Sequence, residues 1–387
     1  MTANERHVKG LDGLRALAVV LVFLAHKAHV EAVDVGKLGV WLFFLISGYL
    51  IVGELHRNRL RIEQHTARRD AVLYVFFIKR ALRIVPVYYL LLIALTIAHA
   101  LFYQREVELG LAWHFAFLSN YWIGVVHDRW PGTVSHFWSL AVEQQFYFAA
   151  PFALLFSRAS RHLAICAAAI GCAALIHLAL YLHGASAPLV YAFSPWNFAL
   201  IALGGAVAIV GARAPVGNGS VSAWWLAAGF ASLAAFAVGR ADCAACVAQQ
   251  RAVLPGLLDI GLALSLCAVF VWIVRSQGNA LVAALDARPL AYLGTISYGF
   301  YLFHNLVPSK LGEDPALYTR LGLPPAADAV VPLVLPLVLQ FALAFVLALL
   351  SWQLLEKRVL EKKRALQAAI DQWLPVHAEA ESARLRA

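Results

Sequence analysis

The chain has 387 residues, of which 62% are apolar and 14% are charged, and its formal net charge is +9. Soluble domains are about 45–50% apolar and about 25% charged, so this composition excludes an ordinary soluble protein, a disordered chain and a collagen-like chain. The apolar residues form continuous runs, such as LAVVLVFLAH and VVPLVLPLVLQFALAFVLALLSW, rather than the short alternating stretches of a β-barrel. The sequence therefore predicts an all-α integral membrane protein.

The apolar runs predict a bundle of about ten transmembrane helices. The predicted spans are 11–30, 36–54, 84–102, 137–156, 162–182, 194–211, 222–239, 253–274, 289–307 and 329–355. An eleventh apolar run, 109–126, is interrupted by His114, Ser119 and Asn120. We expect this run to be membrane-embedded or re-entrant, which is tolerated only where protein surrounds it.

The positions of the Lys and Arg residues predict that both termini are cytoplasmic. Basic residues gather in 55–83 and after the last span, and inner segments of membrane proteins carry the excess of Lys and Arg. A full span at 109–126 would place the last basic segment outside. We therefore divide the chain into a transmembrane domain, 1–355, and a basic cytoplasmic tail, 356–387. Because the basic residues lie between apolar runs, they do not indicate a nucleic-acid surface.

The cysteines and short motifs do not point to a resident cofactor. Of the five cysteines, Cys243 and Cys246 are expected in a loop, with C-x-x-C spacing. One such pair without a second is weak evidence for a metal site, so we predict no metal. We find neither a Walker loop nor a dinucleotide fingerprint, so ATP- or NAD-driven chemistry has no support.

Arg15, His26 and Glu143 are ionisable residues inside predicted spans, where such a residue is unfavourable unless it is paired or faces a cavity. Arg15 and His26 lie on one side of the first helix, about 16 Å apart along its axis. Glu143, in the fourth span, is predicted at a depth similar to that of His26. We therefore predict a carboxylate–imidazole pair with His26 as general base. The alternatives are snorkelling of Arg15 to the interface and structural packing of His26 and Glu143.

The second and ninth spans also carry polar side chains. Ser47, Gly48 and Tyr49 lie at mid-depth in the second span, where close helix packing is the alternative to a binding role. The ninth span contains Ser297, Tyr298, Tyr301 and His304. Tyrosines near an interface commonly form an aromatic belt. His304, near the outer end, could line an acceptor entrance or pack in the core.

A basic cluster marks the inner base of the third helix. Lys79, Arg80 and Arg83 gather there, and residues at i and i+3 share one helix face. Guanidinium forks suit phosphate oxygens; the alternative is positive-inside bias with contact to lipid phosphates. A basic inner cluster and an outer His–Glu pair suit a substrate with a phosphorylated head and a long arm, and coenzyme A has that shape.

Five segments contain these residues: GLDGLRALAVVLVFLAH, GVWLFFLISGYLI, FFIKRALRIVPVYY, SHFWSLAVEQQFYFAAP and LGTISYGFYLFHN. Their sequence and order resemble the family-3 membrane acyltransferases, with a weaker similarity at Glu356. The resemblance implies a multi-pass enzyme of the bacterial inner membrane. Such an enzyme transfers an acyl group, most often acetyl, from cytoplasmic acyl-CoA to a hydroxyl of an extracytoplasmic or lipid-linked carbohydrate. Its partners would be acetyl-CoA or another acyl-CoA, the glycan acceptor and membrane lipid; a homo-oligomer is compatible with this interpretation.

The resemblance also implies residue roles. The family's Arg-x10-His pair corresponds to Arg15 and His26, its R-x-x-R motif to Arg80 and Arg83, and its Trp-Ser…Glu block to Trp138, Ser139 and Glu143. We assign the residues accordingly. The catalytic residues would be Arg15, His26 and Glu143. Acyl-CoA would be bound by Arg80, Arg83, Ser47 and Tyr49, and the acceptor by Trp138, Ser139, Tyr298, Tyr301 and His304. Direct transfer and a His-bound acyl intermediate both remain open.

The chain departs from the family pattern in two places. It reads Trp196-Asn197-Phe198 where members often have an acidic residue before the phenylalanine. Some members have a fused esterase-like domain, and the short tail here leads us to expect any such partner as a separate protein.

The alternative function is a proton-coupled transporter or flippase of glycans or small acids, with His26 and Glu143 as a proton relay. Inverted repeats would favour it, and none is evident. A structural scaffold would leave the buried Arg, His and Glu unexplained.

Overall fold

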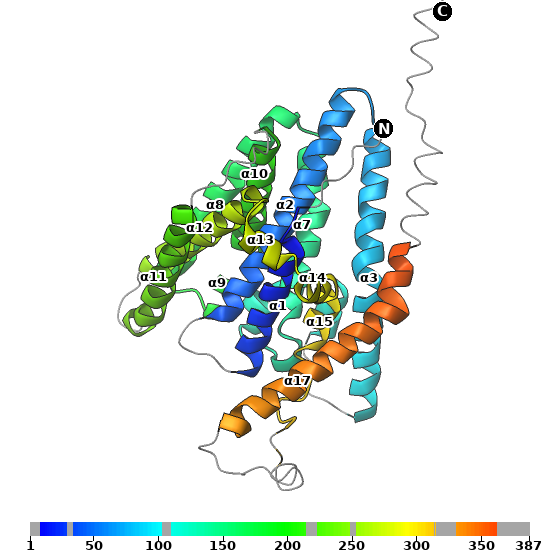
Figure 1. The fold of residues 1–387 in the computed structure, drawn as a ribbon, viewed down its shortest axis with the longest axis vertical. Helices are drawn as coiled ribbons and strands as arrows, with labels where there is room; N and C mark the ends of the chain where they lie inside the picture. The colour runs from blue at the N-terminus through cyan, green and yellow to red at the C-terminus, as the bar shows by residue number, and fades with distance from the viewer. Residues whose placement is uncertain are drawn as a thin grey trace, which may run out of the picture.

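The computed structural model describes residues 8–28, 34–102, 110–213, 223–247, 253–312, 314 and 330–361. Within these ranges every regular element is helical (Figure 1). The longer helices are α1 (Leu11–Lys27), α2 (Val35–Glu63), α3 (Arg69–Phe102), α7 (Phe137–Leu155), α8 (His162–Leu182), α10 (Ser194–Arg213), α11 (Ala223–Val247), α12 (Leu254–Arg275) and α17 (Val330–Ser351). The shorter ones are α5 (Leu111–Phe115), α6 (Ser119–Tyr121), α9 (Ala187–Ala192), α13 (Ala280–Leu285), α14 (Arg288–Thr295) and α15 (Ser297–Phe303). The π-helices η1 (Trp122–His127) and η4 (Trp352–Glu356) and the 3-10 turns η2 (Gly132–Val134) and η3 (Ala159–Arg161) complete the set.

Six of the described helical segments are long and apolar enough to cross a bilayer. They are Val35–Glu63, Arg69–Phe102, Ala159–Leu182, Ala187–Ala212, Leu254–Arg275 and Val334–Glu361. The chain is therefore a multi-pass helical membrane protein. The last of these segments runs past position 355, so helix continues across the expected boundary between the transmembrane domain and the tail.

Two sequence expectations about individual elements need correction. The predicted span 289–307 is two helices, because the chain turns at Ile296; this turn lets α14 pack against α1 while α15 packs against α1 and α17. Cys243 and Cys246 lie in the helical end of α11 rather than in a loop, in a stretch whose alanines favour helix. Their side chains are outside the described residues.

The interrupted run 109–126 forms α5, α6 and η1, three short pieces rather than one spanning helix. Its polar side chains are buried and hydrogen-bonded. The Nδ1 atom of His114 lies 2.7 Å from the Oγ of Ser119, and the Nδ2 of Asn120 donates to the Oγ of Ser194 at 2.8 Å. Each of these three side chains therefore has a hydrogen-bond partner within the protein, as an embedded segment requires.

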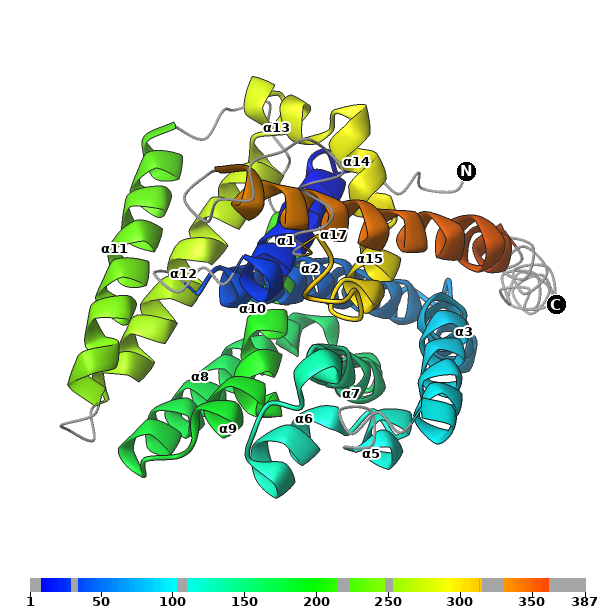
Figure 2. The same ribbon diagram turned by 90° about the horizontal axis from the view of Figure 1, so that it is seen from below.

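Helix α2 lies in the middle of the bundle, with α1 on one side and α7 and α10 on the other (Figure 2). Its contact with α10 depends on two glycines. A Cβ on Gly48 would lie 1.7 Å from the carbonyl oxygen of Ile201, and one on Gly204 would lie 2.0 Å from that of Leu45. Small residues allow this close approach of helix backbones, so Gly48 has a packing role.

A buried ionic cluster ties α2 to α8 and α12. The Nζ of Lys37 lies 3.2 Å from Oδ1 of Asp259, and Oδ2 of Asp259 accepts from the Tyr181 hydroxyl at 2.8 Å. The Nε2 of His177 lies 3.2 Å from the same Oδ2 atom. The carboxylate thus lies among several hydrogen-bonding partners, which a buried charge requires.

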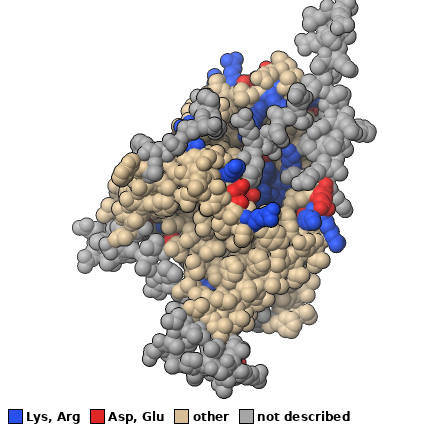
Figure 3. Space-filling view, viewed as in Figure 1, with Lys and Arg blue, Asp and Glu red and all other residues tan. Residues whose placement is uncertain are grey.

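The surface is divided between charged and apolar regions. On the face in Figure 3, the Lys, Arg, Asp and Glu side chains gather in the upper half, and the described surface below them is almost uncharged. Large apolar side chains are exposed along α3, among them Leu90, Ile97 and Leu101. An exposed apolar surface of this kind matches contact with lipid.

Candidate functional site

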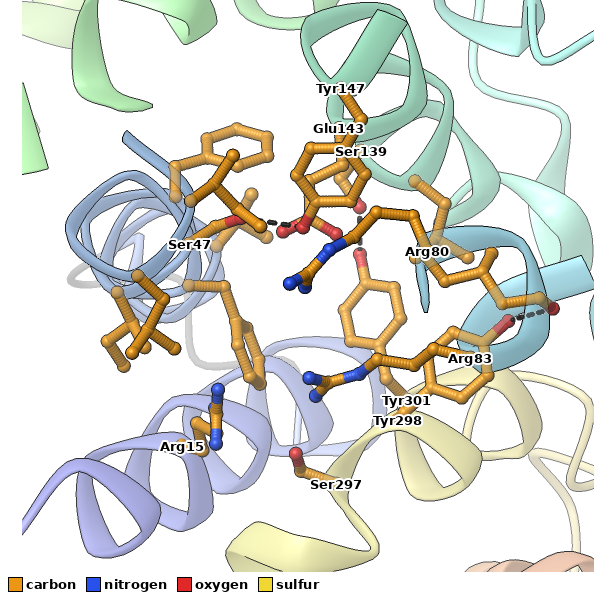
Figure 4. A pocket seen from close by; sticks show the side chains of 18 residues that line it. Arg15, Ser47, Arg80, Arg83, Ser139, Glu143, Tyr147, Ser297, Tyr298 and Tyr301 are labelled. Carbon is orange, nitrogen blue, oxygen red and sulfur yellow. Dashed lines mark hydrogen bonds between the residues drawn. The ribbon is translucent and has the colours of Figure 1, made fainter. Parts of the chain in front are cut away.

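The described helices enclose a polar pocket within the bundle (Figure 4). Its empty volume, open mouth included, is about 780 Å³. The polar and charged side chains that line it are Arg15 of α1, Ser47 of α2, Arg80 and Arg83 of α3, Ser139, Glu143 and Tyr147 of α7, and Ser297, Tyr298 and Tyr301 of α15. Most of the residues selected from the five sequence segments therefore meet in one cavity.

Three guanidinium groups point into this pocket (Figure 4). Arg15 donates to the carboxylate of Asp12 at 2.7 Å, one turn earlier in α1. Arg80 donates to the carboxylate of Glu54 at 2.8 Å, and both side chains are only 15% exposed. Arg83 forms no ion pair within 4.0 Å among the described residues. Of the side chains that line the pocket, three are arginines and one, Glu143, is acidic, and this lining favours an anionic ligand.

Glu54 was missed by the sequence analysis. Its two carboxylate oxygens accept from Arg80 and, at 3.4 Å, from the Nζ of Lys79. It therefore fixes Arg80 from behind the pocket wall. A signal was present, because an acidic residue at the inner end of the second predicted span faces a predicted basic cluster at the base of the third.

Helix α7 supplies one continuous polar wall. Ser139, Glu143 and Tyr147 are spaced four residues apart, so they lie on one helix face. The Tyr147 hydroxyl lies 2.7 Å from the Oγ of Ser47, and the Ser139 Oγ lies 2.6 Å from the Tyr301 hydroxyl. These two hydroxyl pairs connect α7 to α2 and to α15 on either side of the Glu143 carboxylate.

A second cavity adjoins the first and shares Arg15, Arg83 and Tyr298 with it. Asp12, Trp352 and Glu356 are among its other lining residues, and its empty volume is about 990 Å³. Glu356 accepts a hydrogen bond from the Ser351 hydroxyl at 2.7 Å. The two arginines thus stand where the cavities meet.

The predicted contact between His26 and Glu143 is not formed. Glu143 lines the arginine pocket, whereas His26 lies beyond its lining, with its Nδ1 atom 3.0 Å from the Nε2 of His304. The reason is axial, because Glu143 lies about two turns further along α7 than the residue at the depth of His26, and at that depth it faces the arginines. It is His136, near the start of α7, that packs against His304, with ring centroids 5.2 Å apart.

Three other sequence expectations have a different structural setting. Tyr49 does not line the pocket and packs on Phe270 with ring centroids 5.6 Å apart, because two residues turn the helix by about 200° from Ser47. Trp138 is buried and packs against Phe44. His304 is fully buried, so it does not line an open acceptor entrance.

Among the described residues, no group of three or more His, Cys, Asp and Glu side chains could hold a metal ion. In the histidine cluster of His26, His136 and His304, each ring has a nitrogen within hydrogen-bond distance of a backbone carbonyl oxygen. The side chains that the described site offers to a ligand are thus arginines, hydroxyl groups and imidazoles.

Comparison with known proteins gives a consistent assignment. The family model described as an acyltransferase domain matches residues 8–357. The chain is 27% identical over 322 residues to the peptidoglycan O-acetyltransferase OatA of Listeria monocytogenes, covering 78% of this chain and 49% of that protein. It is 31% identical over 163 residues to the O-acetyltransferase OatA of Staphylococcus aureus, covering 40% and 26%. The chain thus spans about half the length, or less, of these relatives. No solved structure matches. Because the family model matches most of the chain, the protein belongs to the family-3 acyltransferases.

Proposed function

We propose that the protein is an O-acyltransferase of the bacterial inner membrane that moves an acetyl group from cytoplasmic acetyl-CoA to a hydroxyl of an extracytoplasmic or lipid-linked glycan. The observation that carries the proposal is the pocket in which Arg15, Arg80 and Arg83 converge next to hydroxyl side chains. The activities of the relatives, peptidoglycan O-acetylation and O-acetylation, support acetyl as the group and a glycan as the acceptor.

The two adjoining cavities fit the donor in this proposal. Coenzyme A has phosphates at one end and a thioester on a long arm at the other. Arg15 and Arg83, where the cavities meet, and Arg80 would hold phosphate oxygens, for which guanidinium is well suited. With both termini cytoplasmic, the donor enters from the end that carries α14 and Glu356. The acetyl thioester then points toward Ser139 and Tyr301.

His26 is the proposed general base on the acceptor side. Its imidazole would take the proton of the acceptor hydroxyl as the oxygen bonds to the acyl carbon, while the bond from that carbon to the coenzyme A sulfur breaks. Glu143 belongs to the donor pocket in this scheme. Its carboxylate partly balances the charge of the arginines. The phosphates are then bound weakly enough for coenzyme A to be released after transfer.

The test is transfer of radiolabel from acetyl-CoA in membranes that contain the wild type, His26→Ala, Arg83→Ala or His162→Ala. His162 is a buried histidine at another position, whose Nε2 lies 2.8 Å from the Leu154 carbonyl oxygen, so it controls for loss of a buried imidazole. We expect label in a glycan or lipid-linked sugar fraction with wild type and His162→Ala, and little with the other two at equal abundance.

Two results would contradict the proposal. Equal labelling by wild type and His26→Ala would remove His26 from the chemistry. Absence of both labelling and acetyl-CoA binding by the purified wild type would favour transport of an anionic solute through the arginine pocket. The labelled fraction, if one appears, identifies the class of acceptor.

A further inference from the structure

His304 lies at the end of α15, fully buried against His26. Its Nε2 atom is 3.0 Å from the Nδ1 of His26, and its own Nδ1 is 2.6 Å from the carbonyl oxygen of Tyr301. The Nδ1 of His26 is also 3.0 Å from the carbonyl oxygen of Val22. These contacts are sufficient to determine which nitrogens bear hydrogen.

The tautomer of His304 follows from its contact with Tyr301. A backbone carbonyl oxygen can only accept a hydrogen bond, so the Nδ1 that faces it must be the N–H. A neutral imidazole has one N–H and one lone pair. The Nε2 of His304 therefore has the lone pair, and it is this acceptor that faces His26.

The tautomer of His26 follows from two contacts that agree with each other. The Nδ1 of His26 faces the Val22 carbonyl oxygen and the Nε2 lone pair of His304, and both are acceptors. The hydrogen of His26 must therefore be on Nδ1, shared between them. The remaining nitrogen, Nε2, has the lone pair, which is what a general base needs.

We propose that His304 is a positioning residue that acts through His26. It accepts the Nδ1–H of His26, keeps Nε2 as the basic nitrogen and stabilises the imidazolium that forms when Nε2 takes the acceptor's proton. This inference rests on the proposed function. The proton passes from the acceptor hydroxyl to Nε2 of His26 and then to the sulfur of coenzyme A, which leaves as the thiol, while the acyl carbon exchanges its bond to sulfur for a bond to the acceptor oxygen.

The surroundings of His304 are suited to holding it in place. Helix α7 contacts the same turn of α15, since the Nε2 of His136 donates to the Leu302 carbonyl oxygen at 3.1 Å. On the other side, the Nζ of Lys27 donates to the Val307 carbonyl oxygen at 2.7 Å, which ties the end of α1 to the segment after His304. The two histidine rings are thus held between three segments of chain. An orienting partner held in this way fixes the ring of the residue that it orients.

The test uses purified protein and steady-state acetyl transfer with the variants His304→Ala and His304→Gln. We expect His304→Ala to lower kcat by about 10- to 100-fold, the usual effect of losing an orienting partner, with the KM for acetyl-CoA unchanged. Glutamine places an amide oxygen close to the position of Nε2, so His304→Gln should recover most of kcat. His162→Ala, which also alters a buried pair of histidines, should retain kcat per folded molecule.

The decisive comparison is made in the His26→Ala background. If His304 acts only through His26, adding His304→Ala to His26→Ala lowers the residual rate no further. A further loss of the same size as in wild type, or a rise in KM with kcat unchanged, would overturn the inference. Both outcomes differ from failure of the proposed function, in which the wild type itself transfers no acetyl group.

Discussion

The contact between α2 and α10 gives a prediction that can be worked from the structure. A Cβ on Gly48 would lie 1.7 Å from the carbonyl oxygen of Ile201, and an ordinary contact begins at 3.4 Å. In Gly48→Ala the two helices must therefore separate by about 1.7 Å at this point. Overpacking of this kind usually costs about 1–3 kcal/mol, and the better helix propensity of alanine offsets only about 0.5–1 kcal/mol of it. We expect a lower melting temperature for Gly48→Ala in detergent.

Gly171, in the middle of α8, provides the matched control. An added Cβ there meets nothing within 4 Å, so Gly171→Ala should leave the melting temperature unchanged or raise it slightly. Acetyl transfer should be lower in Gly48→Ala and unchanged in Gly171→Ala, because separation of α2 also moves Ser47 away from Tyr147. A melting temperature of Gly48→Ala equal to that of wild type and Gly171→Ala would refute the close approach of these helices.

Three further predictions concern charged side chains. Asp259→Asn removes the nearer carboxylate of the buried Lys37 ammonium, at 3.2 Å, and leaves that of Asp34 at 4.0 Å. Breaking a buried pair costs up to about 3–5 kcal/mol, so the melting temperature in detergent should fall, and an unchanged value would show that the pair does not stabilise the fold. Glu54→Gln removes the charged acceptor of Arg80, and a hydrogen bond to a charged group is worth roughly 1.5–3 kcal/mol. The KM for acetyl-CoA should therefore rise about tenfold or more. An unchanged KM would show that Arg80 does not take part in donor binding. Arg83→Lys should raise this KM less than Arg83→Ala, since it retains charge but loses the guanidinium fork; equal KM values would argue against a phosphate contact.

The sequence predicted the class of protein well, because composition and continuous apolar runs are properties of the chain itself. It also selected residues that meet in the pocket. Arg80 and Arg83 share a face by their spacing, and Ser139 and Glu143 do so as well. Helical periodicity determines such neighbours along one helix without reference to any other helix.

The pairing of His26 with Glu143 could not be predicted reliably, because the apolar pattern does not fix how far one helix is shifted along its axis relative to another. Both residues were placed at a similar depth, yet it is His136, seven residues before Glu143, that packs beside the pair of His26 and His304, while Glu143 faces the arginines. The division of span 289–307 into α14 and α15 was missed for a related reason. The apolar pattern continues through Ile296, and tertiary contacts determine the turn.

The buried pair of Lys37 and Asp259 illustrates a different limit. The two residues are 222 positions apart, and no periodicity connects segments at that separation. Lys37 precedes a long apolar run and could be taken for an interfacial residue. One local signal was present, since Asp34 stands three residues before Lys37 and Asp is a favoured N-cap. In the structure the Asp34 side chain accepts from the Lys37 backbone N–H at 2.9 Å, so Lys37 lies in the first turn of α2.

Tyr301 connects the two parts of the site. Its hydroxyl lies 2.6 Å from the Ser139 Oγ at the pocket wall, and its backbone carbonyl accepts from the Nδ1 of His304. The same residue therefore contacts the proposed donor pocket through its side chain and orients the histidine pair through its main chain. Because α15 is a short helix separated from α14 at Ile296, a movement of Tyr301 when the donor binds would also move His304. In the proposed mechanism, Tyr301 would therefore link the donor pocket to the histidine that orients His26.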